Sequence, residues 1–134
     1  MQEFTFNPSY RRDDRGVWVL DTKDIPLPKD FTVRTTPHLV HIAPGGWGGN
    51  HTHRRREAYV GFGADLYIMW RDETGARHEA PMTSDDGKLH VFAVAPHLPH
   101  LVENRGNTPA VLYEILDIDD GEATPLEGAD SLRS

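Results

Sequence analysis

The chain has 134 residues, no cysteine and a formal net charge of −7. This length suits one domain that buries its own core. The lack of cysteine excludes disulfides, thiolate zinc sites, iron–sulfur clusters and a cysteine nucleophile, so any metal must be held by imidazole and carboxylate groups. The acidic balance argues against nucleic acid as a partner. With no signal-peptide pattern and no run near ~20 apolar residues, we expect a cytoplasmic protein with no membrane partner.

Apolar residues recur with period two in short runs, a pattern typical of half-buried strands. Turn signals such as PGGWGG, RDETG, TSDDG and NRGNTP separate these runs. The predicted strands are 17–20, 31–36, 38–43, 57–62, 64–71, 76–81, 88–95, 100–104 and 110–118. Short strands at this spacing predict an all-β barrel or jelly roll, although an immunoglobulin-like sandwich would give the same pattern.

The two ends differ in composition from the part between them. Residues 1–16 are polar and charged, and residues 119–134 are acidic with a proline and glycines. We expect both ends to be peripheral arms with weak order. No repeat or linker divides the chain, so the prediction is one domain over residues 1–134.

Two histidines one residue apart stand out in GGWGGNHTHRRRE, residues 45–57. Residues two apart in a strand share a face, so His51 and His53 would project into one space, as two ligands of one ion must. Glu57 keeps that parity only if no turn interrupts the three arginines before it. The glycines ahead of the histidines suit a tight turn before the strand. A second cluster, VAPHLPHLVEN at residues 94–104, supplies His97 and His100.

These two stretches resemble the two motifs of the cupin superfamily over about residues 39–118. The first motif, G-x5-H-x-H-x3-E, is formed by Gly45, His51, His53 and Glu57. The second, P-H-x3-N, is formed by Pro99, His100 and Asn104. Family members usually have glycine three residues before the second-motif histidine. Here that place is taken by His97, as a group near the site or an outward side chain; histidine tolerates a positive φ better than most residues.

The resemblance implies a double-stranded β-helix, a jelly-roll barrel, with one divalent metal per chain inside. Carried over residue by residue, the implied ligands are His51, His53, Glu57 and His100. Imidazole and carboxylate suit Zn²⁺, Fe²⁺, Mn²⁺, Ni²⁺ or Cu²⁺, with positions left for water or substrate. The alternative is a barrel whose polar residues line a cavity without metal.

Three further residues are candidates for catalysis. Tyr59 shares the face of Glu57 if the strand is regular. Glu114 lies on an otherwise apolar face, so it is either a buried proton carrier with a raised pKa or an edge glutamate that reaches solvent. His41 is either a core histidine or a general base near the metal. The remaining histidines, His38, His78 and His90, are expected on the surface.

Three functions fit this site. The first is a metal-dependent enzyme for a small oxygenated molecule. The form GGNHTH resembles that of bacterial cupins that isomerise or epimerise nucleotide-linked sugars, and Arg54, Arg55 and Arg56 would meet the diphosphate or be merely solvated. The second is a non-haem iron or manganese dioxygenase, which would consume O₂. The third is a binding barrel without turnover. Apolar positions on both faces of 64–71 and 110–118 suit a homodimer or a larger core.

Overall fold

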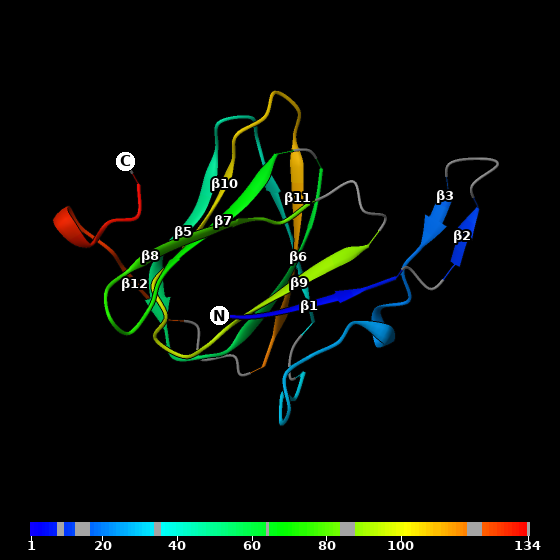
Figure 1. Cartoon of the computed structure of the whole chain (residues 1–134), viewed down its shortest axis with the longest axis horizontal. Coiled ribbons are helices and arrows are strands. Elements are labelled where there is room, and N and C mark those ends of the chain that lie inside the picture. Colours follow the sequence, from blue (N-terminus) through cyan, green and yellow to red (C-terminus); the bar gives the residue numbers. More distant parts are fainter. Residues whose placement is uncertain are drawn as a thin grey trace.

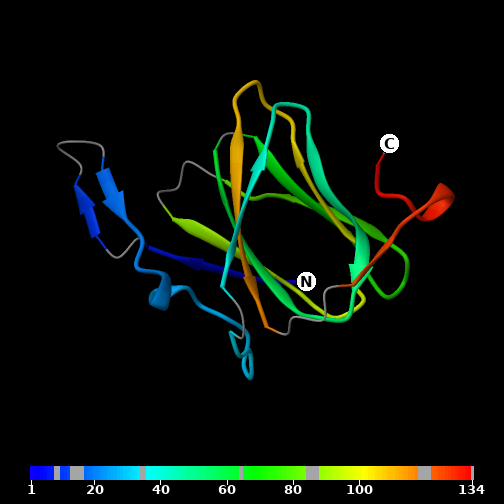
Figure 2. The ribbon, with the colours of Figure 1, turned by 180° about the vertical axis from the view of Figure 1, so that it is seen from behind.

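The computed structural model describes residues 1–7, 10–12, 17–33, 36–63, 65–83, 88–117 and 122–133. Two five-stranded antiparallel sheets face each other in an all-β jelly-roll barrel (Figures 1 and 2), so the predicted fold class is confirmed. The first sheet has the order β1 (Gln2–Phe6), β9 (Leu89–Val94), β6 (Glu57–Phe62), β11 (Ala110–Leu116) and β4 (His38–Ile42). The second has the order β12 (Ala123–Pro125), β5 (Trp47–His53), β10 (His100–Asn104), β7 (Leu66–Arg71) and β8 (Arg77–Pro81).

The main core fills the space between the two sheets. It is built from alternate residues of the strands, because every second side chain of a strand points to the same face. Its buried members are Ile42, Tyr59, Leu66, Ile68, Met82, Phe92, Val94, Val102, Ala110 and Leu112. Alternation alone left open which face of residues 64–71 points inward, since both faces are apolar. The structure places Leu66, Ile68 and Trp70 on the inner side.

A second core lies on the outer face of the first sheet. The segment 20–31 crosses this face, and its Ile25 packs against Ala58, Val60 and Ile115. The segment contains a 3-10 turn, η2 (Thr22–Asp24). The predicted strand over 31–36 is wrong for its described residues, 31–33 and 36. The backbone N–H of Thr32 donates to the side chain of Asp117 at 2.9 Å, so it is not available to a neighbouring strand.

Both ends of the chain contribute strands, which differs from the expected weak order. β1 pairs with β9 at the edge of the first sheet, and its Phe4 and Phe6 pack on the second core. β12 pairs with β5, and Leu132, beyond the 3-10 turn η3 (Gly128–Asp130), is fully buried. β2 (Tyr10–Arg12) and β3 (Val17–Val19) form a separate two-stranded ribbon beside the barrel (Figure 1). Residues 8–9, 13–16, 119–121 and 134 of the expected arms lie outside the described residues.

The glycine-rich stretch before the histidines is partly strand. Gly46 N–H bonds to Ala43 O at 2.8 Å and Gly45 has a φ of 74°, so the turn occupies residues 43–46. β5 begins at Trp47, and Gly48 and Gly49 therefore lie within it. The expectation that these glycines precede the strand holds only for the first pair.

In the described residues, no helix is long and apolar enough to cross a membrane.

Candidate metal centre

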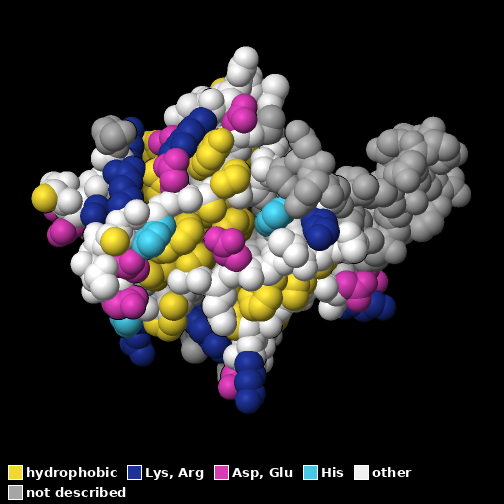
Figure 3. Space-filling view, viewed as in Figure 1, with side chains coloured by type: hydrophobic (Ala, Val, Ile, Leu, Met, Phe, Trp, Pro, Cys, Tyr) yellow, Lys and Arg dark blue, Asp and Glu magenta, His cyan; other side chains and the backbone are white. Residues whose placement is uncertain are grey.

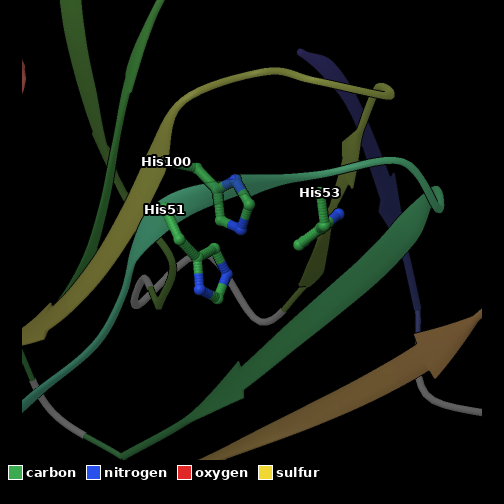
Figure 4. Close-up of side chains that lie close together, drawn as sticks. All are labelled: His51, His53 and His100. Atoms are coloured by element: carbon green, nitrogen blue, oxygen red, sulfur yellow. The ribbon is translucent and has the colours of Figure 1, made fainter. Parts of the chain in front are cut away.

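Three histidines meet inside the barrel. His51 and His53 come from β5 and His100 from the adjacent β10, with His51 and His100 directly opposite each other across the two strands. Their ring centroids are 4.7 to 5.1 Å apart, and one nitrogen from each lies within 4.8 Å of the others. Figure 4 shows the three imidazoles close together, projecting from these two strands toward one another. His53 and His100 are buried, and His51 is partly exposed.

Backbone carbonyls fix the tautomers of two of these histidines. His53 Nδ1 lies 2.8 Å from Arg55 O, and His100 Nδ1 lies 2.7 Å from Leu98 O. A carbonyl oxygen only accepts, so in both rings Nδ1 carries the proton that it donates. A neutral ring then has its free lone pair on Nε2. Histidines that bind metals are usually oriented by a hydrogen bond of this kind from the other ring nitrogen.

Glu57 lies beside the three histidines as a buried carboxylate. Its Oε1 accepts a hydrogen bond from Arg55 Nε at 2.7 Å, and its Oε2 accepts from the hydroxyl of Tyr59 and lies 3.1 Å from His53 Nε2. Burial alone would raise its pKa, but the hydrogen bonds and charge of His53, followed by the bonds from Tyr59 and Arg55, lower the pKa to about 2. Glu57 is therefore ionised at neutral pH.

The histidine nitrogens and the Glu57 carboxylate bring lone pairs and a negative charge close together, so this site requires a positive charge. When His53 is neutral with its proton on Nδ1, it turns a lone pair toward an anionic oxygen, and its buried Nε2 then has no hydrogen-bond partner in the described part of the chain. Only a second proton, on Nε2, would bond it to Glu57. Burial favours the neutral form of His53, but the hydrogen bond and charge of Glu57 outweigh burial and raise the pKa of His53. A proton is therefore attracted to the space between His53 Nε2 and the Glu57 carboxylate. A metal cation would satisfy the same atoms, and the histidine and carboxylate set suits one chemically.

The other two histidines are neutral donors. Burial lowers the pKa of His100 to about 3, and the nearby His53 and His51 lower it further against the bond to Leu98. Burial, and then the charge of His53, also lower the pKa of His51. His100 Nε2 lies 3.1 Å from Tyr59 Oη, but the single hydroxyl proton of Tyr59 is given to Glu57. The Nε2 lone pair of His100 is therefore left for another partner.

Glu114 faces the barrel interior on β11, where it lies directly opposite Tyr59 of β6 and two residues from Leu116, the partner of Glu57. It shares a face of β11 with the core residue Leu112, and its side chain is 18% exposed. Burial, and then the charge of Glu57, raise its pKa. Its Oε1 lies 3.5 Å from Nδ1 of His38, whose side chain is 55% exposed. We expected His38 only as a surface residue. Its parity with Val40 and Ile42 was the signal that it shares their inward face.

His41 lies outside this site. The neighbours on either side of it, Val40 and Ile42, pack into the main core, so His41 points to the opposite face of β4 and is exposed. The expectation of a general base near the metal has no support in this position. Alternation did place His41 on a face with Leu39, but that face is the outer one, where Leu39 is 73% exposed.

The three consecutive arginines do not act as one solvated run. Arg55 binds Glu57, and Arg56 binds Asp117 through Nε and Nη2 at 2.6 Å and the carbonyl of Asp30 through Nη2 at 2.6 Å. Arg54 alone of the three is classed as exposed. Sequence reasoning missed Arg55 as the partner of Glu57. Strand parity could not have shown this contact, because Arg55 lies in the bend before β6 begins at Glu57.

His97 occupies the glycine position of the second motif in the left-handed conformation. Its φ is 63°, its side chain is exposed, and its N–H donates to His53 O at 2.8 Å. The turn expected from the motif is therefore formed with histidine in the place of glycine. Asn104 of the same motif is fully buried and donates to the carbonyls of Ile42 and Thr108, so it closes the following turn.

No family model matches the chain, and no curated protein matches it. Solved structures do match. A dTDP sugar isomerase from Desulfovibrio desulfuricans G20 has 15% identity and a TM-score of 0.73, over 98% of this chain and 89% of that one. An oxalate oxidase has 19% identity and a TM-score of 0.58, over 71% of this chain and 49% of that one, so the match spans about half of the oxidase.

A cupin 2 domain-containing protein from Halorhodospira halophila also matches. It has 13% identity and a TM-score of 0.56, over 97% of this chain and 85% of that one. Together with the jelly-roll barrel, these matches show that the chain has the fold of the cupin superfamily. Its cluster of three histidines fits a cupin that binds a metal.

Proposed function

We propose that the protein is a metal-dependent enzyme that isomerises or epimerises a small oxygenated molecule, such as a nucleotide-linked sugar. The proposed metal ligands are His51, His53, His100 and Glu57. The observation that carries the proposal is the pair of histidines whose Nδ1 protons are bound to backbone carbonyls, leaving Nε2 lone pairs beside an ionised carboxylate. A divalent metal at this point would polarise a carbonyl or hydroxyl oxygen of the substrate.

The chain's own residues supply proton transfer and positioning. Burial, and then Glu57, raise the pKa of Tyr59 well above its usual value, so Tyr59 stays protonated and holds Glu57 in place. Glu114 is the proposed proton carrier, because it lies inside the barrel opposite Tyr59 and burial raises its pKa, which favours uptake of a proton there. His38 contacts Glu114 and reaches solvent, so it would return the proton after each cycle. His41 has no part in this proposal.

Two observations favour a sugar as the substrate class. The dTDP sugar isomerase is similar over nearly the full length of both chains. The barrel interior also places a protonatable carboxyl group and a carboxylate on neighbouring strands, which suits proton movement next to a carbonyl group. The arginines support the diphosphate contact less than expected, since Arg55 and Arg56 bind Glu57 and Asp117.

The first test is metal content, measured by elemental analysis on protein prepared without a chelator or a histidine tag. We expect about one divalent transition metal per chain. His53→Ala should lose it, while the matched control His41→Ala should keep it, because His41 is exposed on the outer face of β4. Metal retained at unchanged affinity in His53→Ala would refute the ligand set.

The second test is turnover of nucleotide-linked keto sugars in D₂O, followed by NMR. Isomerisation or epimerisation through proton transfer should incorporate deuterium from solvent at the reacting carbon. Glu114→Gln should lower the rate and keep the metal. A metal-loaded protein that neither exchanges nor converts any of these sugars would contradict the sugar proposal and favour a barrel that only binds its ligand.

An oxidative function is the second candidate, because an oxalate oxidase shares the fold over 71% of this chain. Histidine and carboxylate ligands suit Fe²⁺ or Mn²⁺ as well as Zn²⁺. Oxygen uptake separates the two proposals. Consumption of O₂ by the iron- or manganese-loaded protein with a small carboxylic acid would favour oxidation, and full activity with Zn²⁺ in the absence of O₂ would favour isomerisation.

The homodimer remains a prediction with less support than the sequence suggested. The outward apolar residues Met69 and Ile115 are covered within the chain, by Leu132 and Ile25 respectively. Leu39 on the edge strand β4 is 73% exposed. Elsewhere, on the face seen in Figure 3, hydrophobic side chains are interspersed with charged and histidine side chains. Light scattering after size exclusion would decide, and a monomer at micromolar concentration would end this prediction.

A further inference from the structure

A β-bulge in β5 determines which way the first histidine points. Before the bulge, Gly48 pairs with Val102 and Gly49 with Leu101; after it, His51 pairs with His100. Asn50 has no opposite residue in β10 and is the extra residue of the bulge. A regular strand would have placed His51 on the same face as Gly49, which is the outer face. The bulge reverses that parity and turns His51 into the barrel.

The bulge needs an unusual backbone conformation. Gly49 has a φ of 88° and Asn50 a φ of 61°, both in the left-handed region. A side chain at Gly49 would meet His100 O at 3.1 Å, so glycine is required there for space as well as conformation. Asparagine tolerates the left-handed region better than most residues. Even so, Asn50 is strained on its own and depends on its surroundings to stay in place.

The C-terminal segment 123–132 provides those surroundings. Asn50 is 8% exposed, and its Nδ2 donates to Ser131 Oγ at 3.0 Å while its Oδ1 accepts from Leu132 N at 2.8 Å. Its carbonyl accepts from Leu126 N at 2.8 Å. Both polar ends of the side chain and the carbonyl of the bulge residue are therefore bound by the same segment.

The segment is itself anchored on the outer face of the second sheet. Leu132 is fully buried against Met69 and Leu101, and its carbonyl accepts from Arg77 at 2.7 Å. At its other end β12 pairs with β5 opposite the two histidines. Figure 2 shows the segment lying outside the barrel next to this sheet. The segment therefore holds β5 from outside the barrel, while His51 and His53 of the same strand point into it.

We propose that Asn50 is a positioning residue for His51, and that residues 123–132 form a strap that locks the bulge. The strap keeps His51 turned inward from the opposite side of the sheet, without contacting the ligand atoms. This inference rests on the proposed metal site for its consequence, a loss of metal affinity. Its structural part, the dependence of the bulge on the strap, does not need the metal.

The test uses Asn50→Gly in the full chain. Glycine keeps the left-handed conformation accessible and removes both side-chain bonds to the strap. We expect amide hydrogen exchange of residues 47–53 to become faster. Zn²⁺ affinity, measured by competition with a chelator, should fall 10- to 100-fold, roughly the loss seen when groups that orient metal ligands are removed.

Ile115→Ala is the matched control. Ile115 is buried on the outer face of the other sheet, away from the strap, so its truncation lowers stability without touching β5. Even where it lowers the melting temperature as much as Asn50→Gly does, Ile115→Ala should leave the amide exchange of residues 47–53 and the Zn²⁺ affinity unchanged. A purely structural role of Asn50 would give the same result in both variants.

Leu132→Ala and Ser131→Ala repeat the test from the strap side, and they serve if Asn50→Gly does not fold. Unchanged exchange in β5 with unchanged Zn²⁺ affinity in the strap variants would overturn the inference. A wild-type protein that binds no Zn²⁺ would refute the proposed metal site instead. In that case the exchange rates still decide whether the strap holds the bulge.

Discussion

Acid should destabilise the metal-free protein through His100. Burial lowers the pKa of this histidine to about 3 in the folded protein, against the ordinary value of 6.5. Between these values the unfolded chain binds a proton that the folded protein does not, so the free energy of unfolding falls as the pH falls from 6.5 toward 3. At pH 5 the loss is about 1.36 × 1.5, or about 2 kcal/mol.

The assay is urea unfolding at pH 7 and pH 5 with a chelator present, for the wild type and His100→Gln. Glutamine does not titrate, so the stability lost between the two pH values should be about 2 kcal/mol smaller in the variant. The pKa of His53 is raised by Glu57 against the effect of burial. Protonation of His53 therefore stabilises the folded protein as the pH falls and opposes the effect of His100. Both proteins contain His53 and Glu57, so the part of their contribution that does not depend on His100 is common to the two proteins. Equal losses in both proteins would refute the reasoning.

Three further predictions concern single residues of the barrel. His97→Gly should raise the free energy of unfolding by about 1 kcal/mol in urea titrations, because glycine suits the left-handed φ of 63° there; a destabilised variant would contradict this. Gly63→Ala should cost more than about 1 kcal/mol by the same assay, since φ is 116° and the added Cβ would lie 3.0 Å from Ala110 Cα. Asp117→Ala should cost about 1 to 3 kcal/mol by leaving the Thr32 N–H without its acceptor, and faster proteolysis within 20–33 would locate the effect.

Much of the barrel was predictable because its strands alternate clearly. The predicted strands 57–62 and 100–104 have the observed bounds, and turn residues mark the ends of most others. The inward position of Tyr59 followed from the parity of Glu57. The edge strands β1 and β12 were missed because each is only a few residues long and lies in a mostly polar end of the chain, where a short alternation does not stand out. Their place depends on partners far away in the sequence.

Within the site, local spacing predicted which residues share a face better than it predicted their contacts. A bend at residues 54–56 interrupts the strand, so Glu57 reaches the site from β6 of the other sheet and not by parity with His53, and nothing in the spacing said that Arg55 would neutralise it. Glu114 was recognisable as an acid on an apolar face, whereas His38 was not, because its relevance depends on the pairing of β4 with β11. Strand pairing is a long-range property, so such partners remain hidden until the topology is known.

The His-x-His motif shows the limit of local reasoning most clearly. The spacing of His51 and His53 predicts that the two rings share a face of one strand. It does not predict whether that face is the inner or the outer one. The answer depends on one extra residue at Asn50, since a strand without it would turn both rings outward. The side-chain bonds of that residue come from Ser131 and Leu132, some eighty positions away. A motif of this kind therefore implies a metal site only in a chain that also supplies the means to hold the bulge.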